Sequence, residues 1–357
     1  MAPNGNGVDA VLPTIKGQSS IFRNNANISG GGIENSGGQV TIEGFSLVHE
    51  NKVVAASGDP GKGGGIFNMS TAAGTADLTI DGSSKVEGNL AFGDLDEPSG
   101  QDLDGGGGIY NDRGMVKIKG GSIVSKNLAD GCNGGGVFNI NGDITIDGGF
   151  VNDNGTVLSI HQTPTHQNLN PTVNGGGIYS YYDGTPFEGA FLTITNSSSV
   201  QDNNAQESGG GIYNNTGTAY VRNGSRVDLN TALGIGDPED PIGGGGIYNT
   251  GGVYIQSYSF VHSNKSLTRD GGGIYNTDGG GVLIEDGVTV FFNEALLGRG
   301  GGVYADATTL NGGEIKYNHA LPVLGSGGGV YKTSLNFLFN AGDITLNTPD
   351  DIVCGLP

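Results

Sequence analysis

Residues 134–154 read Gly-Gly-Gly-Val-Phe-Asn-Ile-Asn-Gly-Asp-Ile-Thr-Ile-Asp-Gly-Gly-Phe-Val-Asn-Asp-Asn, and variants of this stretch recur along the chain. A glycine triplet precedes an apolar residue, an aromatic residue and asparagine, and two segments follow in which apolar and polar residues alternate. Alternation with a period of two is typical of β-strands. Each copy therefore predicts three short strands.

The apolar residue after the glycines marks the repeat. Its intervals run from 27 residues (Ile247 to Ile274) to 43 (Ile66 to Ile109), so the longer copies are minimal units with insertions. The third strand carries (Ile/Val)-x-x-Asn in eleven copies. A column of stacked asparagines at this corner can form a hydrogen-bonded ladder. Its members are Asn24, Asn51, Asn89, Asn127, Asn154, Asn203, Asn230, Asn264, Asn293, Asn318 and Asn347.

These repeats predict an all-β fold, a single-stranded right-handed parallel β-helix. This solenoid has three short strands per coil and about eleven coils, each stacked ~4.8 Å from the next. We expect an N-terminal linker over residues 1–11, the solenoid over 12–348, and a C-terminal cap or tail over 349–357. Ile and Val of the strands should fill the interior.

Composition limits the partners. The 357 residues carry a formal charge of −20, which argues against binding nucleic acid or an anionic membrane surface. The sequence has no apolar run of 18 residues, so we expect no direct membrane insertion. Cys132 and Cys354 fall about seven coils apart, too far for a disulfide.

Insertions concentrate at one corner, between the third strand of one coil and the glycines of the next. A further insertion, Tyr181 to Gly189, follows a first strand close to the longest of these loops. Long loops on one edge of a solenoid often bind ligands. The candidate binding residues are Tyr179, Tyr181, Tyr182, Asp183, Phe187, His161 and His166.

The residue after each apolar anchor is aromatic in nine of ten coils, from Phe67 to Tyr331. Strand alternation directs these rings away from the interior. Two interpretations stay open: a docking stripe for glycan or protein, or a structural ladder that stabilises the stacking of coils.

Acidic loops suggest a cation. One loop contains Asp94, Asp96, Glu97, Asp102 and Asp104, an oxygen-rich set that can hold Ca²⁺, although it does not match the EF-hand spacing. The alternative is a solvated acidic loop. We expect no required cofactor. The five histidines are dispersed apart from His161 and His166, and no nucleophile–base pair can be assembled.

The pairing of Gly-Gly-Gly-Ile with a downstream (Ile/Val/Phe)-x-x-Asn-x-Ala is similar to the repeats of chlamydial polymorphic outer membrane proteins. It also resembles bacterial and archaeal right-handed β-helix surface proteins with GGGIYN coils. This chain has Gly where the chlamydial motif has Ala, and usually Val or Ile for its Phe. The resemblance implies a β-helix that is secreted or displayed at the cell surface.

We therefore expect a non-enzymatic extracellular scaffold or adhesin-like module that presents its loop-lengthened edge to a glycan or surface protein. One alternative is a carbohydrate-active β-helix, a polysaccharide lyase or hydrolase. Another is a filament subunit that stacks with copies of itself through its end coils. Clustered perturbed carboxylates beside a cleft would favour the enzyme, whereas an exposed apolar shelf would favour binding.

Overall fold

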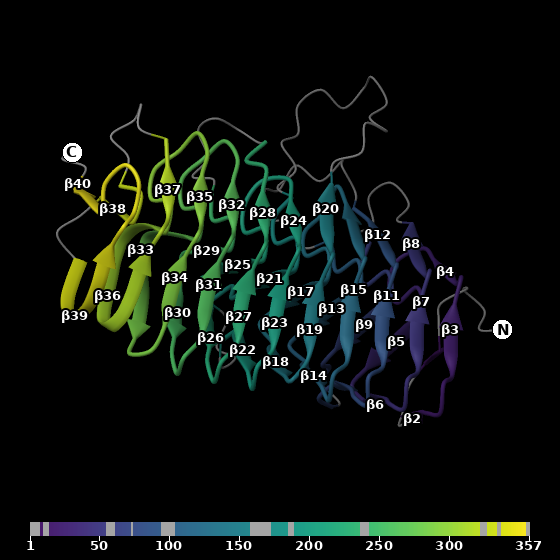
Figure 1. Ribbon diagram of the computed structural model, residues 1–357. Coiled ribbons are helices and arrows are strands. Elements are labelled where there is room, and N and C mark those ends of the chain that lie inside the picture. The colour runs from purple at the N-terminus through teal and green to yellow at the C-terminus, as the bar shows by residue number, and fades with distance from the viewer. Residues whose placement is uncertain are drawn as a thin grey trace, which may run out of the picture.

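The chain folds into a right-handed, three-sided parallel β-helix whose coils stack in sequence order between the two ends of an elongated molecule (Figure 1). The computed structural model describes residues 8–9, 14–54, 61–72, 74–93, 104–157, 173–184, 189–235, 243–321, 327–333 and 337–354. Within them the strand pairings are parallel from coil to coil, apart from one isolated bridge. The predicted fold class is confirmed.

Each coil contributes one strand to each of three sides. The first side contains β1 (Val8–Asp9), β5 (Ile33–Ser36), β9 (Ile66–Met69), β13 (Ile109–Asp112), β17 (Val137–Ile140), β21 (Ile178–Tyr181), β25 (Ile212–Asn215), β29 (Ile247–Asn249), β38 (Val330–Lys332) and β40 (Ile352–Cys354). The second contains β2 (Thr14–Ile15), β6 (Gln39–Ile42), β10 (Asp77–Ile80), β14 (Met115–Lys119), β18 (Asp143–Asp147), β22 (Phe191–Thr195), β26 (Thr218–Val221) and β30 (Gly252–Ile255). The third contains β3 (Ser20–Phe22), β7 (Leu47–His49), β11 (Lys85–Glu87), β15 (Ile123–Ser125), β19 (Phe150–Asn152), β23 (Ser199–Gln201), β27 (Arg226–Asp228), β31 (Phe260–His262) and β34 (Thr289–Phe291).

Near the C-terminal end, longer strands run around the corners. They are β33 (Ile274–Glu285), which joins the first two sides, β36 (Val303–Lys316), which covers all three, and β39 (Phe337–Thr345), which joins the second and third. A short strand also follows each ladder asparagine up to Asn318. These strands are β4 (Asn25–Ala26), β8 (Lys52–Val54), β12 (Leu90–Phe92), β16 (Leu128–Asp130), β20 (Gly155–Val157), β24 (Asn204–Ala205), β28 (Thr231–Ala232), β32 (Lys265–Ser266), β35 (Glu294–Ala295) and β37 (His319–Ala320).

The interior is one continuous apolar core of stacked Ile, Val, Leu and Ala side chains. Equivalent residues pair across neighbouring coils, as Ile109 with Val137 and Val200 with Val227, so each anchor sits directly on the next. Most anchors are almost fully buried because strand alternation turns every second side chain inward. The exceptions lie near the ends of the stack: Ile15 and Ile21 are partly buried, and Phe339 is 52% exposed.

Each glycine of a triplet meets a different steric limit, which the coil at Gly134, Gly135 and Gly136 illustrates. Gly134 holds φ +67°, which disfavours a side chain. A Cβ on Gly135 would lie 2.2 Å from the carbonyl oxygen of Gly155, on the short strand across the coil. A Cβ on Gly136 would lie 2.9 Å from Nδ2 of Asn154. The triplet therefore makes room for both the short strand and the ladder.

The eleven corner asparagines form one unbroken ladder. Each Nδ2 donates to Oδ1 of the asparagine in the next coil, as from Asn127 to Asn154 at 3.0 Å, and the backbone N–H donates to the same oxygen. From Asn51 onward the Nδ2 also donates to a third-strand carbonyl of the previous coil, as Asn127 does to Val86 at 2.9 Å. At the last rung, Oδ1 of Asp351 accepts both bonds from Asn347.

Two further polar ladders lie at other corners, and the sequence analysis missed both. The asparagine of the Gly-Gly-Gly-Ile-aromatic-Asn segment bonds its equivalent, as Asn68 does to Asn111 at 2.7 Å. Serines two residues before the third-strand anchor bond similarly, as the N–H of Ser84 does to Oγ of Ser122 at 3.2 Å. Both were readable as recurrent polar residues at fixed offsets from the anchors.

Two strands lie outside residues 12–348, the range expected for the solenoid. Strand β1 pairs with β5 near the N-terminal end, and β40 pairs with β38 at the C-terminal end. The Cys132 side chain is buried beside Ala91 and Ala129, and its thiol donates to the Ala91 carbonyl oxygen at 3.6 Å.

Core placement predicts opposite outcomes for two acidic substitutions. Val227→Asp buries a charge where the side chain is fully enclosed, and we expect loss of folding or an unfolding free energy lower by at least about 4 kcal/mol. Thr193→Asp on the outer face should change it by less than about 0.5 kcal/mol. Urea denaturation followed by circular dichroism measures both; equal effects would contradict the assigned orientation of the strands.

The ladder predicts a cost for removing one rung. Asn203→Ala strips the acceptor from two N–H groups of Asn154, and we expect about 3 kcal/mol of destabilisation. Asn204→Ala, on the neighbouring exposed position, is the matched control and should cost little. If the ladder did not contribute to stability, the two variants would unfold at the same urea midpoint.

Candidate functional site

The nine aromatic residues that follow the anchors form a continuous stacked ladder. Consecutive rings from Phe67 to Tyr331 lie 4.4 to 5.4 Å apart between centroids, with interplanar angles of 3° to 22°. Phe138 is fully buried and Tyr248 is 3% exposed. Burial raises the pKa of Tyr213 well above its ordinary value. This geometry matches the structural ladder rather than an exposed docking stripe.

The candidate binding residues of the sequence analysis are only partly brought together. Tyr179 is a rung of the aromatic ladder between Phe138 and Tyr213. Tyr181 packs against the same buried cluster as Tyr179. Tyr182 is half-buried, and Asp183 is exposed with its N–H donating to Oδ1 of Asn141. Phe187, His161 and His166 lie outside the described residues.

Of the five candidate calcium ligands, only Asp104 lies within the described residues. Asp94, Asp96, Glu97 and Asp102 lie outside the described residues, and Asp104 is 3% exposed. Within the described ranges, no three His, Cys, Asp or Glu side chains form a group able to hold a metal ion. The same ranges contain no helix long and apolar enough to cross a membrane.

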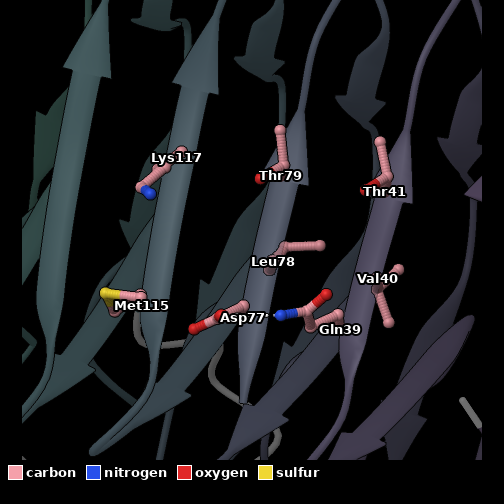
Figure 2. A pocket seen from close by; sticks show the side chains of 8 residues that line it. All are labelled: Gln39, Val40, Thr41, Asp77, Leu78, Thr79, Met115 and Lys117. Carbon is pink, nitrogen blue, oxygen red and sulfur yellow. Dashed lines mark hydrogen bonds between the residues drawn. The ribbon is translucent and has the colours of Figure 1, made fainter. Parts of the chain in front are cut away.

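A shallow depression of about 150 Å³ lies on the outer face of the second side, over β6, β10 and β14 (Figure 2). Thr41, Thr79 and Lys117 form one row, and Gln39, Asp77 and Met115 form the other. Gln39 Nε2 donates to Asp77 Oδ2 at 3.5 Å. These groups can hydrogen-bond a polar ligand.

A more distinctive surface follows the corner between the third and the short fourth strands. The residue before each ladder asparagine holds φ between +53° and +64° in all eleven coils, because the chain must turn sharply to place the asparagine inside. This conformation favours glycine and costs other residues about 1 to 2 kcal/mol. We call this column the corner row; its members are Arg23, Glu50, Gly88, Lys126, Asp153, Asp202, Leu229, Ser263, Phe292, Tyr317 and Leu346.

The corner row changes character along the molecule. Its first six members are charged or glycine, whereas four of the last five are large and apolar. Leu229, Phe292, Tyr317 and Leu346 are 49%, 54%, 46% and 63% exposed, and we call these four the corner ridge. They combine a strained backbone with exposed apolar side chains. The ladder imposes the backbone conformation on every member of the row, but the exposed apolar side chains gather on these coils, and such a gathering is typical of an interaction surface.

A polar cluster adjoins the ridge on the outer face of β23, β27 and β31. The side chain of Asp228 is 5% exposed, and its Oδ1 accepts from Ser199 Oγ at 3.2 Å. Arg226 Nε lies 3.4 Å from that oxygen, and His262 Nε2 lies 3.7 Å from Oδ2. Arg226 also donates to Gln201 Oε1 at 3.1 Å, so the guanidinium is held from two directions.

Aromatic contacts join the cluster to the ridge. The ring of His262 stacks on Phe291 with centroids 4.7 Å apart, Phe291 meets Phe292 edge-on at 5.3 Å, and Phe292 stacks on Tyr317 at 5.4 Å. The cluster and ridge therefore form one continuous surface from Asp228 to Tyr317.

Titratable groups at the polar end are perturbed by burial. Desolvation is the main cause that raises the pKa of Asp228, and the charges of Arg226 and His262 offset part of it. Desolvation likewise lowers the pKa of His262, against the opposing charge of Asp228. The pKa of Asp202 is raised by burial first, and then by the charges of Asp153 and Asp228.

Comparisons with known proteins add no relative: no protein-family model, curated protein or solved structure matches this chain.

The sequence analysis missed the corner ridge, although a signal for it was present. Each ridge residue directly precedes the asparagine of the (Ile/Val)-x-x-Asn motif, as in Phe292-Asn293 and Tyr317-Asn318. A position required to bend sharply and filled with Phe, Tyr or Leu could have been singled out. The backbone conformation, which makes the choice costly, became known only from the structure.

The raised pKa of Asp202 predicts a pH-dependent effect on stability. An aspartate whose folded-state pKa exceeds its unfolded one destabilises the fold when ionised, and this penalty disappears as the pH falls below both values. Asp202→Asn should therefore raise the unfolding free energy at pH 7, by about 0.5 kcal/mol, with the gain shrinking towards about pH 3. Urea titrations at several pH values test this; a gain that does not change with pH would contradict it.

Proposed function

We propose that this chain is a non-enzymatic, adhesin-like extracellular scaffold that docks a protein partner on its corner ridge. The observation that carries the proposal is the exposure of Leu229, Phe292, Tyr317 and Leu346 at strained corner positions on one row. Aromatic and large apolar residues on rigid backbone are the usual anchors of protein interfaces, because little entropy is lost when they are covered. The three polar ladders provide that rigidity.

Ring orientation favours a protein over a glycan. Phe292 and Tyr317 stack on each other across neighbouring coils, so their faces are largely turned along the solenoid axis. A sugar ring packs best against an open aromatic face, whereas apolar side chains of a protein can also pack against ring edges. A glycan is the second ligand class, and the depression at Thr41, Thr79 and Lys117 would be its place of contact.

An enzymatic function has less support. Asp202 and Asp228 are neighbouring carboxylates with raised pKa values, which is a feature of glycoside-cleaving sites. Asp228, however, is almost fully enclosed, and Ser199, Arg226 and His262 surround its oxygens. A carboxyl group in that position stabilises its neighbours and does not reach a bound polysaccharide.

The finer features of the proposal come from the sequence. Similarity to β-helix surface proteins and to chlamydial polymorphic outer membrane protein repeats supports secretion or surface display. The net charge of −20 supports a neutral or basic partner. Stacking of copies through end coils is the competing interaction, and a concentration-dependent mass in sedimentation analysis would reveal it.

The ridge predicts a selective loss of binding. The full chain is immobilised and screened with a phage-displayed peptide library and with an array of neutral and acidic glycans. We expect selected peptides whose affinity falls at least tenfold on Phe292→Ala/Tyr317→Ala, which removes two anchors.

Tyr258→Ala provides the matched control, because Tyr258 is 71% exposed and also holds a positive φ of +58°. It lies between β30 and β31, at the corner between the second and third sides, and so outside the corner row. Its peptide affinity should be unchanged. If the chain retains glycans and selects no peptide, its function is carbohydrate binding and not protein docking. If new reducing ends appear in the bound glycans, the chain is an enzyme.

A further inference from the structure

Directly beyond the ridge, the corner row carries two neighbouring aspartates, and Lys126 occupies the coil before them. Asp202 and Asp153 occupy the row one and two coils before Leu229, with the Asp153 N–H bonded to the Gln201 carbonyl of the next coil at 3.3 Å. Each carboxylate accepts a 3.3 Å bond from a neighbouring amide, Asn152 or Gln201. Neither forms an ion pair within the part of the chain that the structure describes. A partner lying along the row would thus meet apolar groups and then two carboxylates, of which Asp202 is influenced by the charge of Arg226.

The spacing of the row restricts the shape of that partner. Corner positions repeat every ~4.8 Å, and an α-helix advances 5.4 Å per turn, so the offset between helix turns and coils grows by about 0.6 Å per coil, to about 2 Å over the three intervals from Leu229 to Tyr317 and about 3.6 Å over six. Side chains on one face of an extended strand repeat at about 6.6 Å, so their offset from the corner positions grows by about 2 Å at every coil. A helix parallel to the solenoid axis fits the row better.

We infer that the docking segment of the partner is an amphipathic helix with a basic end, laid lengthwise along the corner row. Its apolar face covers Leu229, Phe292, Tyr317 and Leu346, and its Lys or Arg side chains reach Asp202 and Asp153. Six coil intervals separate Asp153 from Leu346, so the helix spans about 29 Å, or about 19 residues. This inference depends on the proposed function, because it describes the partner of the same ridge.

Charge complementarity gives the contact an expected dependence on salt. Cations near Asp202 relieve the repulsion that Asp153 and Asp228 impose on it, and this gain is screened as ionic strength rises. The apolar part of the contact changes little with salt. Binding should therefore weaken with added salt to a plateau set by the ridge.

The test uses the full chain and three synthetic 20-residue peptides, with affinities measured by fluorescence anisotropy. The first is a Leu-faced helix with Lys confined to one end, the second replaces Lys by Glu, and the third keeps Lys but has two central prolines. We expect the second and third to bind at least tenfold more weakly than the first. Equal binding of the Lys and Glu peptides, or of the first and third peptides, would overturn the inference.

Protein variants separate the two ends of the row. Asp153→Asn/Asp202→Asn should weaken the Lys peptide about tenfold at low salt and remove most of its salt dependence. Asp143→Asn/Asp147→Asn removes two exposed charges from the second side and should change neither. An equal loss in both double variants would mean general attraction to an acidic protein and would also overturn the inference.

The failures of the two proposals are distinguishable. If library peptides depend on Phe292 and Tyr317 but no helical basic peptide binds, the docking function stands and the inferred helix is wrong. If Phe292→Ala/Tyr317→Ala changes the binding of no peptide, the ridge is not a docking site and both fall.

Discussion

The asparagine ladder is the constraint on which the rest of the molecule depends. A primary amide is placed inside each turn of a narrow solenoid, where an unpaired N–H would be costly, and stacking satisfies it with the amide of the next coil. To point inward there, the chain must bend sharply at the preceding residue. The ladder also excludes a Cβ from the third glycine of the triplet. The corner conformation and the exclusion of a side chain at the third glycine both follow from the buried amide.

This dependence explains where the molecule can carry function. Packing restricts the interior positions to Ile, Val, Leu and Ala, and the rings of the aromatic ladder stack on one another. The corner row is different, because its backbone is fixed by the ladder while its side chains point to solvent. Such a position can change residue type from coil to coil without loss of the fold. The corner row changes from charged to apolar residues while its backbone conformation stays the same.

The fold was predictable from sequence because repetition carries it. The eleven third-strand motifs and ten glycine segments indicate coil, corner and core, and the structure has these features in register. The candidate site was not predictable to the same degree. Regular residues such as Tyr179 drew attention as a binding stripe, but in the structure they stack on each other. Phe292 and Tyr317 could be noticed in the sequence as aromatic residues directly before a ladder asparagine, but their positive φ and their exposure came from the structure. The contact of His262 with Asp228 joins two coils through side-chain geometry.

The replacement of a twelfth asparagine by Asp351 has an electrostatic consequence. All side-chain amides of the ladder donate in the same direction, so their dipoles add along the axis and leave a positive end beside Asn347. An asparagine there would accept those bonds but present its own amide hydrogens to no following rung. A carboxylate accepts without donating, and its negative charge opposes the summed dipole, as an acidic N-cap does for an α-helix. The asparagine ladder therefore has a dipole along the solenoid axis, and the carboxylate of Asp351 offsets its positive end.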